Sequence, residues 1–407
     1  MQLPPLMAKY MRELDWQKDE PEKIYDTPII LEGFYNMADG VGAHLPNMCD
    51  YLFSDYKNVS LAIQKGREPI HFPNLLLTQN PRDIKWKQKW LNLRELHIHT
   101  NNFYNSVYIH VSGFKQMHDT PKEFSEHLME LNRIKKLCSP KKTVLYFMWE
   151  STGVEVFEPV LKEYDCIVVT NTWLKKQIEE HIPGANVQKV EHIASYYKQK
   201  ASGVSDNFIF GFSGGLWERK KADVVVNAFN LMKKKDDILK IHSRAFVNTP
   251  PMIKKIKAEI NKNPSQIEFK NETLNDKDFA EWWDTLNCYV FVSAGEGYSI
   301  TPRQALMQGT PVILSKNTSH LDLLDVPGIL WVTCEEKSTA EWSASADMHI
   351  SVGAQFEPIL DEVVECMKEV KANYTYWKAE AIKGGKILEG RTSPETIKNQ
   401  WRNLINE

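Results

Sequence analysis

Apolar residues gather in short runs along the chain, separated by polar turns and by segments with helical periodicity. In the first half, the runs predict strands within 27–33, 93–100, 106–114 and 143–150 and at the start of 166–182. In the second half, they predict strands at the start of 208–234 and within 238–243, 266–271, 288–295 and 311–316. Short runs rich in β-branched and aromatic residues are typical of buried strands. The chain is therefore expected to contain two successive sets of strands.

The segments between these runs predict turns and helices. Residues 166–182, CIVVTNTWLKKQIEEHI, have the pattern of a strand, a Thr/Asn turn and an amphipathic helix, and 208–234 repeats this order around a glycine turn. Strands that alternate with helices are typical of doubly wound parallel sheets. We therefore predict an α/β protein with two doubly wound, parallel-sheet, Rossmann-like domains that face a central cleft.

A pause in this alternation indicates the domain boundary. Residues 195–207 are polar and contain Gly203, so we place the interdomain linker there. The predicted domains are 1–197 and 198–385, followed by a helical tail at 386–407.

Residues 290–315, VFVSAGEGYSITPRQALMQGTPVILS, predict a strand, an acidic loop, a helix and a second strand. Glycines flank Glu296, the pair Thr301-Pro302 favours a helix start, and Gly309 favours its end. Such a loop offers backbone N–H groups to an anion and one carboxylate to hydroxyl groups. A sugar joined to a diphosphate presents both kinds of group.

Three glycine-containing segments follow strand candidates: 39–42, 213–215 and 295–297. In doubly wound sheets, ligands bind beyond the carboxyl ends of the strands. The agreement of the three segments therefore predicts a ligand site in the cleft between the domains.

Composition narrows the function classes. Lys and Arg number 50 against 53 Asp and Glu. Residues 1–200 hold 25 basic and 25 acidic residues, which leaves 25 basic and 28 acidic residues in the remainder. Neither half is basic, so charge gives no support to general nucleic-acid binding. The chain has no apolar run long enough for a membrane span, and its six cysteines lack a CxxC pair, which favours a reducing cytoplasm.

Two of the segments contain motifs with defined spacing. The first has Glu, Gly, aromatic, small and aliphatic residues in order, and it continues to a Gly-x-Pro-Val ending: Glu296, Gly297, Tyr298, Ser299, Ile300, Ala305, Gly309, Pro311 and Val312. The second, FSGGLWERKKADVVVNAF, has Gly214, Leu216 and Lys220 at the spacing of a Gly-Arg-Leu-x-x-x-Lys-Gly block. With the glycine-rich turn GVGAHLPNMCDYL at 40–52, they resemble the retaining glycosyltransferases of the two-domain GT-B fold, in particular family 4, which is related to glycogen and sucrose synthases.

The resemblance implies a GT-B architecture in which residues 1–197 bind the acceptor, residues 198–385 bind the nucleotide sugar and the tail at 386–407 packs back on the N-terminal domain. It also implies roles for individual residues. Glu296 would bind hydroxyl groups of the donor sugar, and Lys220 would supply positive charge to the diphosphate. Backbone N–H groups around Tyr298, Ser299 and Ile300 would hold that diphosphate, and position 304 would face the ribose. The remaining donor-binding candidates lie in the three glycine segments: Gly40, Val41, Gly42, His44, Ser213, Gly214 and Gly297.

The chain departs from the family pattern at three positions. Gln304 replaces the second glutamate of the family's pair, so the ribose contact lacks a charge. Gly215 replaces the expected arginine, and Arg219 or Arg303 is a candidate substitute. Glu150 follows a strand where the family often has a His-Asp pair, and we assign it to orienting the acceptor or the sugar.

The implied chemistry needs no cofactor. A nucleoside diphosphate sugar, with UDP or GDP as the base-bearing part, is the expected donor. Attack on the same face, with the leaving phosphate as base, requires neither a metal ion nor a carboxylate nucleophile. The Asp276-Lys277-Asp278 sequence is expected to begin a helix rather than to bind metal. Candidate acceptors are a glycan, a glycolipid, a protein or a small molecule.

Two other functions remain open. One is sugar transfer to modified bases in DNA, which the balanced charge does not favour. The other is a non-catalytic sugar-binding or scaffold protein, which Gln304 and Gly215 favour and the intact Glu296 segment opposes. A dinucleotide-dependent oxidoreductase should carry G-x-G-x-x-G after its first strand, and neither GGLWER nor GVGAHL has that spacing.

Overall fold

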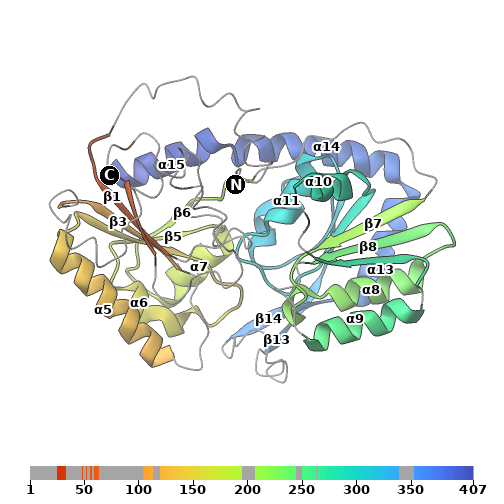
Figure 1. The fold of residues 1–407 in the computed structure, drawn as a ribbon, viewed down its shortest axis with the longest axis horizontal. Helices are drawn as coiled ribbons and strands as arrows, with labels where there is room; N and C mark the ends of the chain where they lie inside the picture. The colour runs from red at the N-terminus through yellow and green to blue at the C-terminus, as the bar shows by residue number, and fades with distance from the viewer. Residues whose placement is uncertain are drawn as a thin grey trace.

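A computed structural model describes residues 25–33, 48, 52, 56, 59–63, 104–112, 120–194, 207–243, 250–262, 264–272, 274, 276–338 and 353–406. These residues form two α/β units that lie side by side, each built on a six-stranded sheet. Two long C-terminal helices run across both units (Figure 1).

The first sheet belongs to the N-terminal domain and has the order β2-β1-β3-β4-β5-β6. All of its strand pairs are parallel. The strands are β1 Ile29–Gly33, β2 Val59–Ile63, β3 Val107–Ser112, β4 Lys142–Phe147, β5 Cys166–Val169 and β6 Val187–Lys189. The described helices are α5 Thr120–Cys138, η3 Val154–Phe157, α6 Glu158–Leu161 and α7 Thr172–His181.

The second sheet belongs to the C-terminal domain and has the order β12-β11-β10-β7-β8-β9, again with parallel pairs throughout. Its strands are β7 Phe208–Ser213, β8 Asp237–Ser243, β9 Ile267–Asn271, β10 Cys288–Phe291, β11 Val312–Ser315 and β12 Ile329–Val332. Its helices are η4 Glu218–Lys220, α8 Ala222–Met232, α9 Pro250–Lys262, α10 Asp276–Asp284, α11 Ile300–Met307, η6 Thr318–Leu323 and α13 Leu360–Ala372. An antiparallel pair, β13 Cys334–Ser338 and β14 Ala354–Pro358, follows β12.

The predicted α/β class with two doubly wound parallel sheets is confirmed. Each described apolar run forms a strand, whereas the run at 93–100 lies outside the described residues. The strand predicted for 143–150 ends at Phe147, because the chain then turns toward the other domain. Strands β2, β6 and β12 and the antiparallel pair β13–β14 were not predicted, since runs of three to five residues leave little periodicity to recognise.

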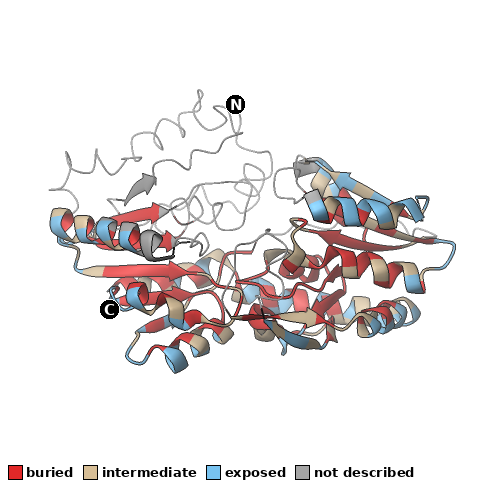
Figure 2. Ribbon diagram, turned by 90° about the horizontal axis from the view of Figure 1, so that it is seen from below, coloured by how far each residue is buried: buried red, intermediate tan, exposed pale blue. Residues whose placement is uncertain are grey.

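Most strands are buried along their length, whereas the outer sides of the helices are exposed (Figure 2). In β1, Ile29 and Leu31 face one core cluster of the N-terminal domain, whereas Ile30 faces the other. The C-terminal domain has one larger cluster around β7 and β10, with strands buried on both faces. Parallel strands covered by helices on both faces are expected to be apolar throughout.

Helices α14 Tyr374–Arg391 and α15 Pro394–Asn406 join the two domains. A Cβ atom at Gly385 would lie 2.3 Å from the carbonyl oxygen of Leu306, so α14 passes very close to α11. Trp401 of α15 is fully buried in a core cluster of the N-terminal domain. Helix α14 runs through the boundary predicted at residue 385, and most of the predicted linker lies outside the described residues. None of the described helices has the length and apolar character needed to cross a membrane.

Candidate functional site

The strand order of the second sheet brings the loops after β7 and β10 next to each other at the carboxyl ends of the strands. Strands β7, β8 and β9 build outward in one direction, and β10, β11 and β12 build outward in the other. The order therefore reverses between β7 and β10, where the loops after the two strands diverge and leave a crevice. The β7 loop leads into Lys220, and the β10 loop contains Glu296.

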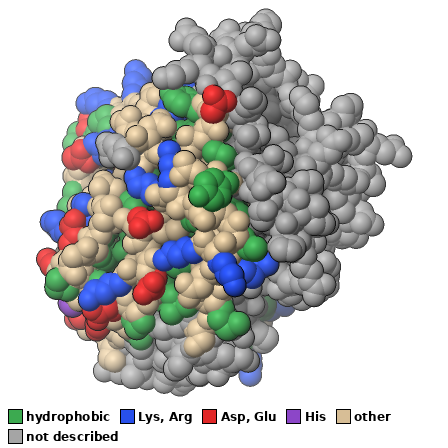
Figure 3. All heavy atoms as spheres, turned by 90° about the vertical axis from the view of Figure 1, so that its left-hand side faces the viewer, with side chains coloured by type: hydrophobic (Ala, Val, Ile, Leu, Met, Phe, Trp, Pro, Cys, Tyr) green, Lys and Arg blue, Asp and Glu red, His purple; other side chains and the backbone are tan. Residues whose placement is uncertain are grey.

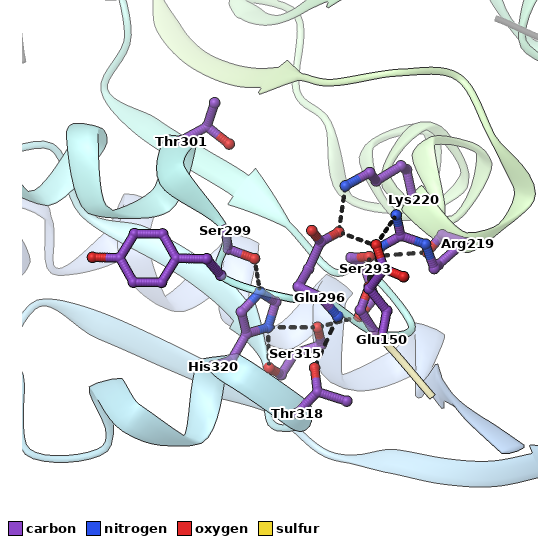
Figure 4. A network of polar contacts seen from close by, with 12 residues as sticks. Glu150, Arg219, Lys220, Ser293, Glu296, Ser299, Thr301, Ser315, Thr318 and His320 are labelled. Carbon is purple, nitrogen blue, oxygen red and sulfur yellow. Dashed lines mark hydrogen bonds and ion pairs between the residues drawn. The ribbon is translucent and has the colours of Figure 1, made fainter. Parts of the chain in front are cut away.

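A compact charge cluster fills this crevice (Figure 4). The Oε1 atom of Glu296 accepts hydrogen bonds from Lys220 Nζ at 2.6 Å and from Arg219 Nη1 at 3.0 Å. The Nη2 atom of Arg219 lies 3.2 Å from Oε1 of Glu150, which comes from the other domain. The two predicted catalytic residues of the C-terminal domain are thus in direct contact, and Glu150 lies beside them.

Burial and charge shift the pKa values of this cluster. Burial by itself would raise the pKa of Glu296, but the charges and hydrogen bonds of Lys220 and Arg219 outweigh it and lower the pKa to about 2. Burial lowers the pKa of Lys220, and the neighbouring Arg219 charge lowers it further. Burial also opposes the charged form of Arg219, yet the carboxylates of Glu150 and Glu296 raise its pKa. Glu296 is therefore ionised at neutral pH, and it faces two cationic side chains.

Arg219 also ties the two loops together. Its carbonyl oxygen accepts hydrogen bonds from the Ala294 N–H at 2.8 Å and from the Ser293 hydroxyl at 3.1 Å. Its side chain donates to the carbonyl oxygen of Gly295. The next residue but one, Lys221, has a left-handed backbone with φ 53°, at the position where the family block has glycine. Arg219 thus brings a guanidinium to the site from a position four residues after the family's missing arginine.

The turn after Glu296 leads directly into α11. Ser299 is the N-cap residue and has φ 62° and ψ 76°, again in the left-handed region. A helix of eight residues begins at Ile300, so the N–H groups of its first turn lack intrahelical partners. The Glu296 N–H donates to the Thr318 hydroxyl at 2.9 Å, which holds the start of the turn.

Side chains behind the turn are fully buried. The His320 ring contacts the Ser299 hydroxyl with Nε2 at 2.7 Å and the Ser315 carbonyl oxygen with Nδ1 at 2.8 Å. Arg303 stacks over the Tyr298 ring, 3.9 Å from its centroid, and donates to the carbonyl oxygens of Tyr298 and Ser299. Arg303 therefore contacts the carbonyl side of the turn, while Arg219 contacts Glu296.

The N-terminal domain closes over the same turn. The Gly297 carbonyl oxygen accepts hydrogen bonds from the Thr170 hydroxyl at 2.5 Å and from Asn171 Nδ2 at 2.7 Å. The Tyr298 hydroxyl donates to the His192 carbonyl oxygen at 3.0 Å. A Cβ atom at Gly295 would lie 2.1 Å from the Glu150 carbonyl oxygen. Glycine at position 295 is therefore needed for the close approach of the domains.

The remaining predicted residues occupy different places. Ser213 ends β7, and its hydroxyl lies 3.0 Å from His242 Nδ1; Gly214 follows and packs on the rings of Phe212 and Phe291. Gln304 is half-buried on α11. Gly40, Val41, Gly42 and His44 lie outside the described residues. Asp276 is the first residue of α10, and no group of three or more metal-ligating side chains occurs in the described part of the chain.

Several residues of the site were not predicted from the sequence. They are Ser293, Thr318 and His320 in the C-terminal domain and Thr170 and Asn171 in the N-terminal domain. The last two lie in the Thr/Asn turn that was recognised between β5 and α7, so that turn is the one signal that was available.

Part of the C-terminal half matches a known protein family. Residues 207–346, which contain the charge cluster except for Glu150, match the family described as Glycosyl transferases group 1. No curated protein matches the chain. The match covers residues 207–346 of the chain, and the prediction of a glycosyltransferase is confirmed.

Solved structures of very low sequence identity share the fold. Sucrose-phosphate synthase from Thermosynechococcus elongatus superposes with a TM-score of 0.66 at 12% identity, over 93% of this chain and 98% of that chain. HepE from Anabaena, in complex with UDP and glucose, superposes with a TM-score of 0.65 at 10% identity, over 93% and 99%. A glycosyltransferase from Rickettsia africae gives 0.60 at 10% identity, over 94% and 98%. The GT-B fold is thereby confirmed.

Proposed function

We propose that the protein transfers a sugar from a nucleoside diphosphate sugar to a hydroxyl acceptor, with retention of configuration and without a metal ion. The observation that carries the proposal is the pairing of Glu296 with Lys220 and Arg219 directly before the N-terminus of α11. Two cationic side chains and a helix N-terminus suit a diphosphate, and the carboxylate suits sugar hydroxyls. UDP-sugars are the first donors to test, because HepE forms complexes with UDP and with UDP-glucose.

The site residues have separate roles in the proposed reaction. The bond from the anomeric carbon to the diphosphate oxygen breaks, and negative charge develops on that oxygen. Lys220, Arg219 and the N–H groups around Ser299 would stabilise this charge, and one such donor is worth about 3–4 kcal/mol in comparable anion sites. The acceptor oxygen attacks on the same face, and its proton passes to the leaving phosphate.

Glu296 and Glu150 would act on the sugar and the acceptor. Glu296 would accept hydrogen bonds from donor-sugar hydroxyls. It is buried and held by its two cationic neighbours, so its oxygens have a defined position. Glu150 is more exposed and reaches the site from the N-terminal domain, where the acceptor is expected. We assign Glu150 to orienting the acceptor or the sugar, and Gln304 to contacting the ribose.

The described residues at one end of the N-terminal domain do not favour a DNA acceptor. Figure 3 shows one end of the N-terminal domain, where basic and acidic side chains are interspersed among the described residues. A surface that binds nucleic acid usually gathers Lys and Arg on one face. Binding of duplex DNA that weakens steeply with salt would nevertheless reverse this assignment.

Ligand-induced stabilisation tests the proposal. UDP, GDP, ADP and CDP and their common sugar conjugates are compared by thermal unfolding, and nucleoside diphosphate release is then followed with candidate acceptors. A donor at a hundredfold excess over its Kd should stabilise the folded state by about 2.7 kcal/mol, which raises Tm by a few degrees.

Variants separate a donor site from unspecific binding. The Lys220→Ala variant should lose the ligand-induced rise in Tm. The control Lys368→Ala, which changes an exposed residue of α13, should keep it. If no nucleotide stabilises the parent protein, the transferase proposal fails. If nucleotides bind but none is ever released from a donor, the non-catalytic sugar-binding alternative is favoured.

A further inference from the structure

Ser299 has an unusual backbone for a residue with a side chain. Its φ of 62° and ψ of 76° lie in the left-handed region, which favours glycine and is rarely adopted by serine. The residue directly precedes α11, so its conformation determines where the N–H groups at the start of this helix point. Contacts from the surrounding protein must therefore hold it.

His320 makes the contact that can hold Ser299. The ring is fully buried, and burial is the main reason that its pKa falls to about 4, so it is neutral at pH 7. Its Nδ1 atom lies 2.8 Å from the Ser315 carbonyl oxygen, which can only accept, so Nδ1 carries the proton. Nε2 is then the acceptor, and the Ser299 hydroxyl donates to it at 2.7 Å. The Ser299 hydroxyl thus points toward the buried His320 ring (Figure 4).

Arg303 fixes the opposite side of the same turn. Its Nη1 group donates to the carbonyl oxygens of Tyr298 and Ser299. In a trans peptide unit, the carbonyl and the N–H point in opposite directions. The N–H groups of Ser299 and Ile300 therefore face away from Arg303. Backbone N–H groups at the start of a helix such as α11 suit a phosphate group.

We propose that His320 is a positioning residue. By accepting a hydrogen bond from the Ser299 hydroxyl, it keeps Ser299 in the left-handed conformation and keeps the N–H groups of the turn directed at the donor diphosphate. The inference deepens the proposed function and rests on it. It assigns the Ser299 side chain to holding the backbone, and it assigns phosphate recognition at this turn to the backbone N–H groups.

Two substitutions at Ser299 distinguish two possible roles of its hydroxyl group: holding the backbone conformation and contacting the ligand. Ser299→Ala removes the hydroxyl but keeps the Cβ atom, so the left-handed conformation loses its support. Ser299→Gly also removes the hydroxyl, but glycine adopts that conformation without help. We expect Ser299→Ala to weaken nucleoside diphosphate binding about tenfold and Ser299→Gly to stay within about threefold of the parent.

The measurement is isothermal titration calorimetry of the full chain. UDP, GDP and ADP are titrated into the parent, and the tightest of the three is carried to the variants, together with its nucleoside. The N–H groups of the turn should contact only the phosphates, so the substitutions should change the affinity for the diphosphate and leave the affinity for the nucleoside the same in every variant. An equal loss of nucleoside affinity would indicate general disruption of the domain and would overturn the inference.

A second pair of variants tests His320 itself. His320→Ala should weaken diphosphate binding about tenfold, and adding Ser299→Gly to it should restore most of that loss. If Ser299→Ala and Ser299→Gly lose diphosphate affinity equally, the hydroxyl contacts the ligand directly and the positioning role is wrong. If the parent binds none of the three diphosphates, the proposed donor site itself fails, which is a separate outcome. If His320→Ala does not fold, the comparison of Ser299→Ala with Ser299→Gly still tests whether the hydroxyl holds the backbone.

Discussion

Arg219 joins the two domains at the site: its Nη2 atom lies 3.2 Å from Oε1 of Glu150, and its Nη1 atom lies 3.0 Å from Oε1 of Glu296. Glu150 belongs to the N-terminal domain and Glu296 to the C-terminal domain, so one buried guanidinium binds a carboxylate from each. The N-terminal domain therefore adds one carboxylate to a charge cluster whose other members all come from the C-terminal domain.

Neutralising Glu296 should separate its structural role from its role toward the sugar. In Glu296→Gln, Lys220 and Arg219 lose a buried counter-charge, which should reduce the free energy of unfolding by about 3 kcal/mol. An anionic ligand supplies the missing charge, so UDP should stabilise this variant more than the parent, while sugar transfer is lost.

Chemical denaturation with and without UDP measures both effects. Glu365→Gln, an exposed residue of α13, is the matched control and should change neither quantity. A Glu296→Gln variant as stable as the parent would contradict the assigned charge balance.

Stability should fall below about pH 6.5 because of buried histidines. Burial lowers the pKa of His127 to about 4, and the ring is surrounded by the Tyr164 hydroxyl and the stacked His110 ring. The unfolded chain therefore binds a proton near pH 6.5 that the folded protein does not bind until about pH 4. The unfolded state binds more protons in this window, so each such histidine costs on the order of 2–3 kcal/mol across it.

His127→Gln tests this linkage. The free energy of unfolding, measured by denaturant titration from pH 7.5 to pH 4.5, should fall less steeply in the variant than in the parent. His181→Gln, at an exposed position of α7, serves as the control and should retain the parent slope. Parallel slopes for His127→Gln and the parent would contradict the prediction.

A side chain at Gly295 should prevent close approach of the domains. The added Cβ atom would lie 2.1 Å from the Glu150 carbonyl oxygen, a distance that backbone atoms must move to relieve. We expect Gly295→Ala to lose activity, to reduce stability by about 1–3 kcal/mol, and to increase the radius of gyration in small-angle X-ray scattering. Gly390→Ala is the control, because nothing lies within 4 Å of its Cβ position on α14. It should leave the shape unchanged.

Asn171 has two functions that can be separated. Its side-chain oxygen caps α7 by accepting from the Leu174 N–H at 2.8 Å, while Nδ2 donates to the Gly297 carbonyl oxygen. Asn171→Ser keeps an N-cap oxygen for α7 but removes the interdomain amide donor. We expect normal stability and donor affinity reduced by roughly five- to tenfold. Asn171→Ala should lose about 1 kcal/mol of stability as well, and unfolding and UDP titrations distinguish the two.

Local sequence determined most of the fold. Apolar runs such as those of β7 and β10 predict their strands because side chains on both faces of a parallel sheet are buried. The helix start at Thr301-Pro302 was placed within one residue, since proline favours the first turn. Glu296 and Lys220 were recognised because each lies in a motif whose spacing survives in a short segment.

Tertiary structure alone decided how the site is assembled. Arg219 and Glu296 are 77 positions apart, and no local pattern specifies that β7 and β10 are neighbours where the strand order reverses. The role of His320 depends on the left-handed backbone of Ser299, and sequence does not reveal a positive φ at a residue other than glycine. The sequence determines which segments carry the chemistry, because strands and loops form from local interactions. Packing decides which side chains meet, because those contacts join residues that are distant along the chain.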